Sequence, residues 1–170
     1  MPLLGYFITV HTYGTWLHDQ AKGSVDKDHN TPNTERFPPN PVRLAIAKAA
    51  LKYSPIHLDA EQRYVVDAAI REVCEYRKWS MHALNVRTTH WHVVATANGY
   101  TPERVMNDFK AYSTRGLRTL QVMSPDIDPW DYHGSTRYLN TPESFARAIE
   151  YVLHEQGPRL EMRPPKRPAR

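Results

Sequence analysis

The chain has 170 residues, a formal net charge of +4, and hydrophobic and charged shares of 41% and 24%. These proportions are ordinary for a soluble globular protein, and the length suits one domain with a core of its own. The single cysteine, Cys74, excludes a disulfide framework and a thiolate zinc site. The chain starts without signal-peptide features and has no apolar run of membrane-spanning length, so we expect a cytoplasmic protein with no membrane partner.

The excess of positive charge lies at the C-terminal end. Residues 158–170 carry five basic side chains and one acidic side chain, which leaves 17 of each in the rest of the chain. We therefore predict a domain over 1–157 and a basic, proline-rich tail over 158–170. Such a tail suits electrostatic contact with phosphates, but its composition is equally typical of a solvated end. Charge alone does not establish nucleic-acid binding.

The first half of the chain predicts one strand, a polar excursion and two helices. Residues 6–13 are rich in β-branched and aromatic side chains and predict a strand. Residues 19–41 are polar and broken by prolines, which is typical of a long loop. Residues 42–51 and 59–77 predict helices. In the second helix Asp59 is the expected N-cap, and the apolar stripe is Val65, Val66, Ala69, Ile70 and Val73.

The second half predicts paired strands followed by two capped helices. Thr101-Pro102-Glu103 and Thr141-Pro142-Glu143 each combine an N-cap threonine with a proline and an acid in the first turn. The expected elements are strands over 81–86 and 90–96, a helix over 101–121, a connector over 123–130, a strand over 135–139 and a helix over 141–156. This order suits an α+β fold in which helices cover one face of an antiparallel sheet.

A pair of histidines is a candidate for half of a metal site. His90 and His92 flank one tryptophan in a strand-like segment, so both imidazoles point to the same face. Two imidazoles are half of a divalent-metal site, although a short motif also arises by chance in a chain with nine histidines. A histidine triad would need a third histidine where Val94 stands. A hard cation such as Mg²⁺ or Mn²⁺ also takes oxygen ligands, and Glu155 and Gln156 follow later in the chain.

A tyrosine beside such a metal could act as a nucleophile. Its hydroxyl can attack a phosphodiester and keep the cut end covalently attached. In the last predicted helix Tyr151 and Glu155 are four residues apart and share a face, whereas Gln156 lies off that face. Spacing alone does not choose between Tyr151, Tyr112 and Tyr138.

Three segments together resemble a known family. They are His90-Trp91-His92, residues 108–118 and residues 151–156, and they occur in the order found in HUH single-tyrosine transposases. The sequence is similar to the REP-associated tyrosine transposases and the related small insertion-sequence enzymes over residues 5–156. The resemblance implies the HUH endonuclease fold, a ferredoxin-like or RRM-like antiparallel sheet with helices on one face.

The resemblance also implies a chemistry. Tyr151 would attack DNA and form a 5′-phosphotyrosine, and the metal, Mg²⁺ or Mn²⁺, would be held by His90, His92 and a residue that follows Tyr151. The family usually has glutamine or asparagine four residues after the tyrosine, and this sequence departs from that pattern with Glu155 there and Gln156 one position later. We favour Glu155 on helix geometry, with Gln156 as the alternative.

Single-stranded or hairpin DNA is the partner that the resemblance implies, bound in the nucleoid by a homodimer or a monomer. Arg104, Arg115 and Arg118 share a stripe of the helix over 101–121 and are predicted phosphate contacts, with a solvated basic face as the alternative. The resemblance adds Lys110 on the same helix. Arg137, farther along, is a further predicted DNA contact.

Three other functions share part of this pattern. A replication initiator or relaxase-type nickase uses the same first step. A domesticated hairpin-DNA-binding protein would bind without cutting. A metal-dependent phosphoesterase for small molecules would need no tyrosine.

Overall fold

The computed structural model describes residues 2–17 and 40–166. Its four strands form one antiparallel sheet in the order β2-β3-β1-β4, and they are β1 (Gly5–His11), β2 (Ser80–Val86), β3 (His90–Thr96) and β4 (Ser135–Leu139). The helices are α1 (Pro41–Ala49), α2 (Ala60–Arg77), α3 (Pro102–Thr119) and α4 (Pro142–His154). This arrangement confirms the predicted α+β, ferredoxin-like fold.

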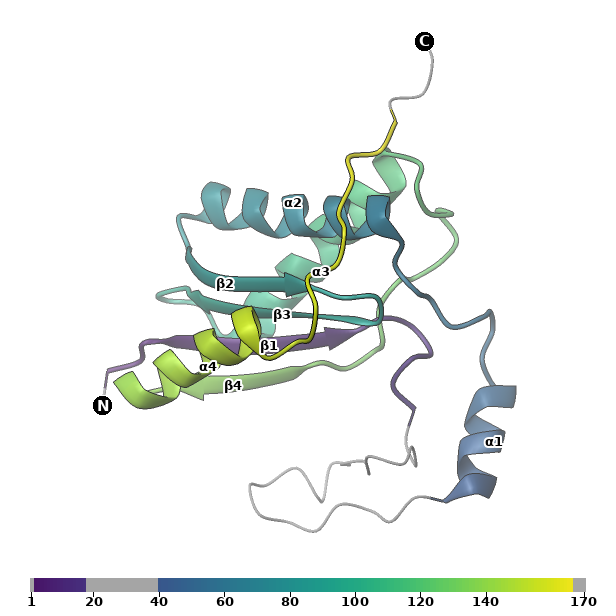
Figure 1. Ribbon diagram of the computed structural model, residues 1–170, viewed down its shortest axis with the longest axis horizontal. Helices are drawn as coiled ribbons and strands as arrows, with labels where there is room; N and C mark the ends of the chain where they lie inside the picture. The colour runs from purple at the N-terminus through teal and green to yellow at the C-terminus, as the bar shows by residue number, and fades with distance from the viewer. Residues whose placement is uncertain (1, 18–39, 167–170) are drawn as a thin grey trace.

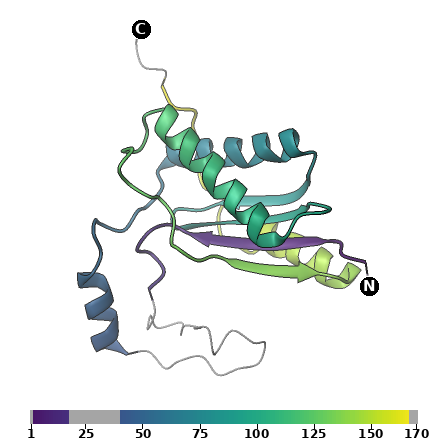
Figure 2. The same cartoon turned by 180° about the vertical axis from the view of Figure 1, so that it is seen from behind.

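The sheet carries helices on both faces. Helices α2 and α3 cover one face, and α4 lies on the other, which differs from the prediction of helices on one face only. Helix α4 stands in front of the sheet in Figure 1, and α3 stands in front after the half-turn of Figure 2. Alternation along β3 produces this, because Trp91 and Val93 belong to the core under α2 and α3 while Val94 packs with Val152 of α4. Successive side chains of β3 therefore face α2 and α3 on one side of the sheet and α4 on the other.

The capping residues set where the helices begin. Asp59 caps α2 with a reciprocal hydrogen-bond pair to Gln62, and Thr101 and Thr141 cap α3 and α4. The predicted apolar stripe of α2 is confirmed, since all its members are buried: Val65, Val66, Ala69, Ile70 and Val73. Each cap fulfils the sequence prediction because its side-chain oxygen accepts a hydrogen bond from a first-turn N–H.

Helix α4 ends earlier than predicted. His154 is its last residue, and Glu155 leaves the helix with φ −110° and ψ 15°. Gly157 then takes a left-handed conformation with φ 78°, which suits a residue without a Cβ. The prediction of a helix through Gln156 is therefore wrong, and Gln156 lies on the turn that follows the helix.

The region around α1 also differs from the prediction. Pro41, the last residue of the predicted excursion, is the first residue of α1, and Asn40 caps the helix through its side chain. Residues 19–39 of that excursion lie outside the described residues. Helix α1 buries none of its residues and stands beside the body of the domain (Figure 1). Among the helices of the described residues, none has the length and apolar character needed to cross a membrane.

The start of the predicted basic tail is fastened to the domain. Arg87 Nη1 donates a hydrogen bond to the Pro158 carbonyl at 2.7 Å, and Arg63 Nη2 donates to the Glu161 carbonyl at 2.8 Å. The Arg163 N–H donates to the carbonyl of the first residue of α2 at 3.1 Å. Residues 157–163, here called the C-terminal strap, thus run from the end of α4 to the start of α2, as the yellow trace of Figure 1 shows. Residues 167–170 lie outside the described part of the chain.

Candidate functional site

The two predicted ligand histidines lie together on the α4 face of the sheet. His90 and His92 have ring centroids 4.7 Å apart, and their cross-strand neighbours on β1 are His11 and Thr9. His92 is only 6% exposed, and its Nδ1 lies 2.7 Å from the Thr9 hydroxyl. Since Thr9 engages Nδ1, Nε2 is the nitrogen of His92 that would bind a metal.

Burial keeps His92 neutral. Desolvation, and after it the neighbouring imidazoles of His90 and His11, which disfavour another positive charge, together lower the pKa of His92 to about 3. Burial likewise lowers the pKa of His11 to about 4. An imidazole that stays unprotonated at neutral pH keeps a lone pair free for a metal.

Tyr151 is the tyrosine that meets the histidines. It is 36% exposed, and its ring stands edge-to-face against His92 at 5.6 Å and against Phe7 at 5.9 Å between centroids. Tyr112 belongs to α3 on the opposite layer, where its ring lies beneath an arginine. Tyr138 packs edge-on against a residue of the core under α2 and α3. Of the three tyrosines left open by spacing, only Tyr151 contacts His92.

The early end of α4 separates the two predicted oxygen ligands. The Glu155 carboxylate pairs with the Arg147 guanidinium on the exposed side of α4, with one of the contacts at 3.1 Å. Gln156 instead turns back toward the sheet, where its side chain hydrogen-bonds His92 and its Nε2 donates to the Tyr151 carbonyl at 3.2 Å. The structure thus brings Gln156, and not Glu155, to the histidine pair.

The donor set is neutral. No cluster of three or more His, Cys, Asp or Glu side chains able to hold a metal is found within residues 2–17 and 40–166. His90, His92 and Gln156 together supply two imidazole nitrogens and one amide oxygen. This set fits a divalent cation that keeps some of its water, because neither imidazole nor amide neutralises the charge.

Arg137 is the one predicted DNA-contacting cation on this face. Arg137 on β4 is the cross-strand partner of Phe7 on β1, and its guanidinium carbon lies 5.5 Å from the centre of the Phe7 ring. The same ring contacts Tyr151 and His92. The arginine therefore places a positive charge on the same Phe7 ring that Tyr151 and His92 contact.

The four other predicted cations lie on α3, behind the sheet. Arg104 pairs with Asp108 at 3.2 Å, and Lys110 Nζ donates to the Asp131 carbonyl at 2.9 Å. Burial lowers the pKa of Lys110, whose amine braces the connector between α3 and β4. The structure therefore does not bring these cations to the tyrosine.

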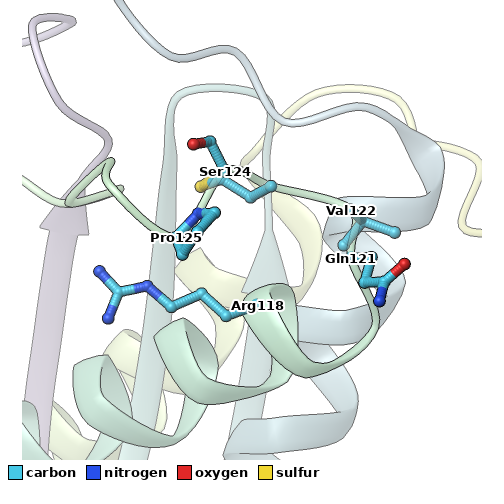
Figure 3. Close-up of a pocket in the computed structure, with 6 residues that line it drawn as sticks. Arg118, Gln121, Val122, Ser124 and Pro125 are labelled. Atoms are coloured by element: carbon cyan, nitrogen blue, oxygen red, sulfur yellow. The ribbon is translucent and has the colours of Figure 1, made fainter.

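A groove nevertheless follows this side of α3. It has a volume of about 620 Å³ and runs between α3 and the connector, with Lys110, Arg115 and Arg118 along it and Tyr132 at its edge. Tyr132 is 91% exposed. Arg118 also borders a second pocket at the end of α3, with residues 121–125 (Figure 3). The groove offers cations and one accessible ring on the layer opposite the histidines.

Three residues near the site were missed by sequence reasoning. His11 lies opposite His90 in the sheet, Trp16 stacks on His11, and Arg87 fastens the strap next to Gln156. Their positions depend on strand register and on the path of the strap. The alternation of the first strand, with a histidine at one end, is the only sequence signal that could have indicated His11.

A family model matches the middle of the chain. Residues 49–127 match the model described as IS200-like transposase. Over this segment, the chain is similar to the IS200-like transposases. The match includes His90, His92 and helix α3, and it ends before Tyr151. No curated protein matches the chain.

Two solved structures are similar to this chain. A REP-associated tyrosine transposase bound to a REP hairpin is similar with a TM-score of 0.50 and 10% identity, over 89% of this chain and 67% of that one. A second structure, of a proposed transposase from Deinococcus radiodurans R1, has a TM-score of 0.46 and 12% identity, over 89% of this chain and 90% of the other. At 10% identity, the first likeness shows a common fold.

Proposed function

We propose that this chain nicks and rejoins single-stranded DNA in transposition, through a covalent 5′-phosphotyrosine on Tyr151. One observation carries the proposal: the end of α4 brings both Tyr151 and Gln156 against His92. A nucleophile and a neutral ligand set therefore meet at one place on the sheet. The family match supports a role in transposition.

The reaction needs no nucleotide cofactor. The Tyr151 phenolic oxygen forms a bond to phosphorus, the bond from phosphorus to the 3′ oxygen breaks, and that oxygen leaves as a hydroxyl after taking up a proton. Tyrosine has an ordinary pKa of about 10, so its own proton passes to water or a base as it attacks. The phosphotyrosine keeps the energy of the broken bond, and a 3′-hydroxyl can later displace the tyrosine.

Each neighbouring side chain has a part in this reaction. His90, His92 and Gln156 would hold Mn²⁺ or Mg²⁺, which withdraws charge from a non-bridging oxygen of the phosphate when bound. Arg137, which contacts the same Phe7 ring as Tyr151, would donate hydrogen bonds to the same phosphate. Thr9 contacts Nδ1 of His92 and holds the orientation of its ring.

Hairpin DNA is the proposed substrate, contacted on a second surface. The cations and the exposed ring of the α3 groove suit a phosphate backbone and an unpaired base. The similar structure with a REP hairpin supports a hairpin as the ligand. Because Tyr151 lies against His92 of its own chain, we propose that one chain supplies a complete site, in a dimer or a monomer.

Incubation with a hairpin-bearing single-stranded oligonucleotide and Mn²⁺ tests the proposal. Denaturing gels should show a covalent protein–DNA adduct that is lost in Tyr151→Phe and in His90→Ala. Cleavage that persists in Tyr151→Phe would overturn the nucleophile and favour a hydrolase. Tight hairpin binding without an adduct would favour a binding protein. A replication initiator or relaxase would form the adduct but would not join the cut ends of a transposon-like substrate.

A further inference from the structure

Five aromatic rings form a continuous row across the α4 face. Beginning at the nucleophile, the centroid separations are 5.6 Å from Tyr151 to His92, 4.7 Å to His90, 5.4 Å to His11 and 4.6 Å to Trp16. The last two rings are stacked, with 18° between their planes. Trp16 therefore forms the end of the row that lies farthest from Tyr151.

Trp16 differs from the other tryptophans because it is accessible. Trp79, Trp91 and Trp130 are buried, whereas Trp16 keeps 39% of its surface exposed even with His11 against its ring. An indole held flat by one partner and open to solvent is the kind of surface on which a nucleobase stacks.

The turn that carries Trp16 is firmly built. Thr12 is fully buried, and its hydroxyl lies 2.6 Å from the Ile56 carbonyl and 3.1 Å from the Thr89 carbonyl. The Thr15 hydroxyl donates to the Thr12 carbonyl at 2.8 Å. These bonds fasten the turn to the residue that precedes His90. Little conformational entropy is then left to lose when a base stacks on Trp16.

We propose that Trp16 stacks on the nucleobase immediately 5′ to the scissile phosphate. The inference deepens the proposed function and rests on it. In-line attack puts the leaving 3′ oxygen on the side of phosphorus away from Tyr151, and along the row of rings that side is occupied by Trp16. The leaving nucleotide is the one on the 5′ side of the cut. A stacked base there would hold the new 3′-hydroxyl at the site for the rejoining step.

The test couples a change in the protein to a change in the DNA. The cut position is mapped from the wild-type adduct on the hairpin oligonucleotide, and oligonucleotides are made with an abasic site one nucleotide 5′ or 3′ of it. Binding is measured by fluorescence anisotropy with Mn²⁺ in a Tyr151→Phe background. Trp16→Ala should weaken binding of the intact oligonucleotide roughly 5- to 150-fold, the range for loss of one base–aromatic stack.

The decisive result is non-additivity. The 5′ abasic site should weaken binding by a similar factor, and the variant and the abasic site together should cost no more than either alone. Additive losses, or coupling to the 3′ nucleotide, would overturn the proposal. Trp16→Phe should keep most of the affinity and shows whether any loss comes from misfolding. Tyr64→Ala, which removes a ring of similar exposure (40%) on α2, is the matched control and should change nothing.

A second readout is independent of cutting. Since Trp16 is the one exposed tryptophan, bound oligonucleotide should quench the tryptophan fluorescence, and Trp16→Phe should abolish the quenching. Absence of quenching in the wild type would overturn the stacking. If the wild type forms no adduct, the proposed function fails, whereas the quenching experiment still decides whether Trp16 receives a base.

Discussion

Gln156 hydrogen-bonds His92, although it lies one position beyond the residue that helix spacing favours as a ligand. Its neighbour Glu155 is occupied by Arg147. We therefore expect Gln156→Ala to lower the affinity for Mn²⁺ at least tenfold and to abolish adduct formation, because one of three protein ligands is lost. Isothermal titration with Mn²⁺ measures the affinity.

Glu155→Ala is the matched comparison. It removes an exposed ion pair, so stability and Mn²⁺ affinity should change little. The opposite ranking, with Glu155→Ala more damaging to metal binding than Gln156→Ala, would restore the acid as the third ligand.

The choice of metal follows from the ligands. Two imidazoles and an amide oxygen suit Mn²⁺ better than Mg²⁺, which prefers an oxygen shell and gives up water reluctantly. Mn²⁺ should support adduct formation at a concentration at least about tenfold lower than Mg²⁺, and a chelator should stop the reaction. Equal activity at equal concentrations of the two ions would point to a carboxylate in the site.

Arg137 should matter for the reaction more than Arg104 does. Arg137→Ala removes the charge beside Tyr151 and should slow adduct formation roughly 10- to 100-fold, since a donor to the reacting phosphate is lost. Arg104→Ala only breaks a pair with Asp108 on the opposite layer and should stay within about twofold. Single-turnover rates at saturating oligonucleotide separate this effect from DNA affinity. Equal losses in both variants would contradict it.

The metal-free protein should lose stability as the pH falls below about 6.5, because His92 is buried in its neutral form. The pKa of His92 is about 3 in the folded chain, against 6.5 as its ordinary value. Between these values the unfolded chain binds a proton that the folded chain does not, so the free energy of unfolding falls as the pH falls.

Urea unfolding at pH 7.5, 6 and 5, with a chelator present, measures the slope. His92 contributes at most about 1.4 kcal/mol per pH unit. His92→Asn should have a shallower slope than the wild type between pH 6.5 and 5, and equal slopes would contradict the buried neutral imidazole.

Phe109 should be among the most costly core positions. Its ring is fully buried, at 5.9 Å from the Trp79 ring and 6.0 Å from the Trp91 ring between centroids. Phe109→Ala should lower the free energy of unfolding by about 3–5 kcal/mol, through lost burial and the cavity left behind. Chemical denaturation followed by circular dichroism measures this, and a loss below about 1 kcal/mol would show that the core relaxes around the gap.

Local signals explain which parts of the fold were predictable. Asp59, Thr101 and Thr141 each mark a helix start because a cap acts on N–H groups only two or three residues away. The placement of His90 and His92 on one face follows from strand alternation. The pairing of His11 with His90 is set by sheet register, which involves residues far apart in the chain.

The preference for Glu155 as the third ligand depended on where α4 ends. Helix geometry favoured Glu155 only if α4 continued past it, and no residue-level signal opposed one more turn. The structure ends α4 at His154, and Gly157 takes a left-handed backbone conformation where the chain enters the strap that Arg87 holds. An error of two residues at a helix end was enough to exchange the side chain that meets His92.

The C-terminal strap bears on how two copies of this chain could share their sites. Exchange of α4 between partners would require the helix to swing out, and the strap that follows it is held by hydrogen bonds to Arg87 after β2 and to Arg63 and Ala60 of α2. These three hydrogen bonds would have to break before Tyr151 could reach another subunit. A chain shortened before Pro158 would lose these hydrogen bonds, and its helix α4 could then exchange with that of a second subunit.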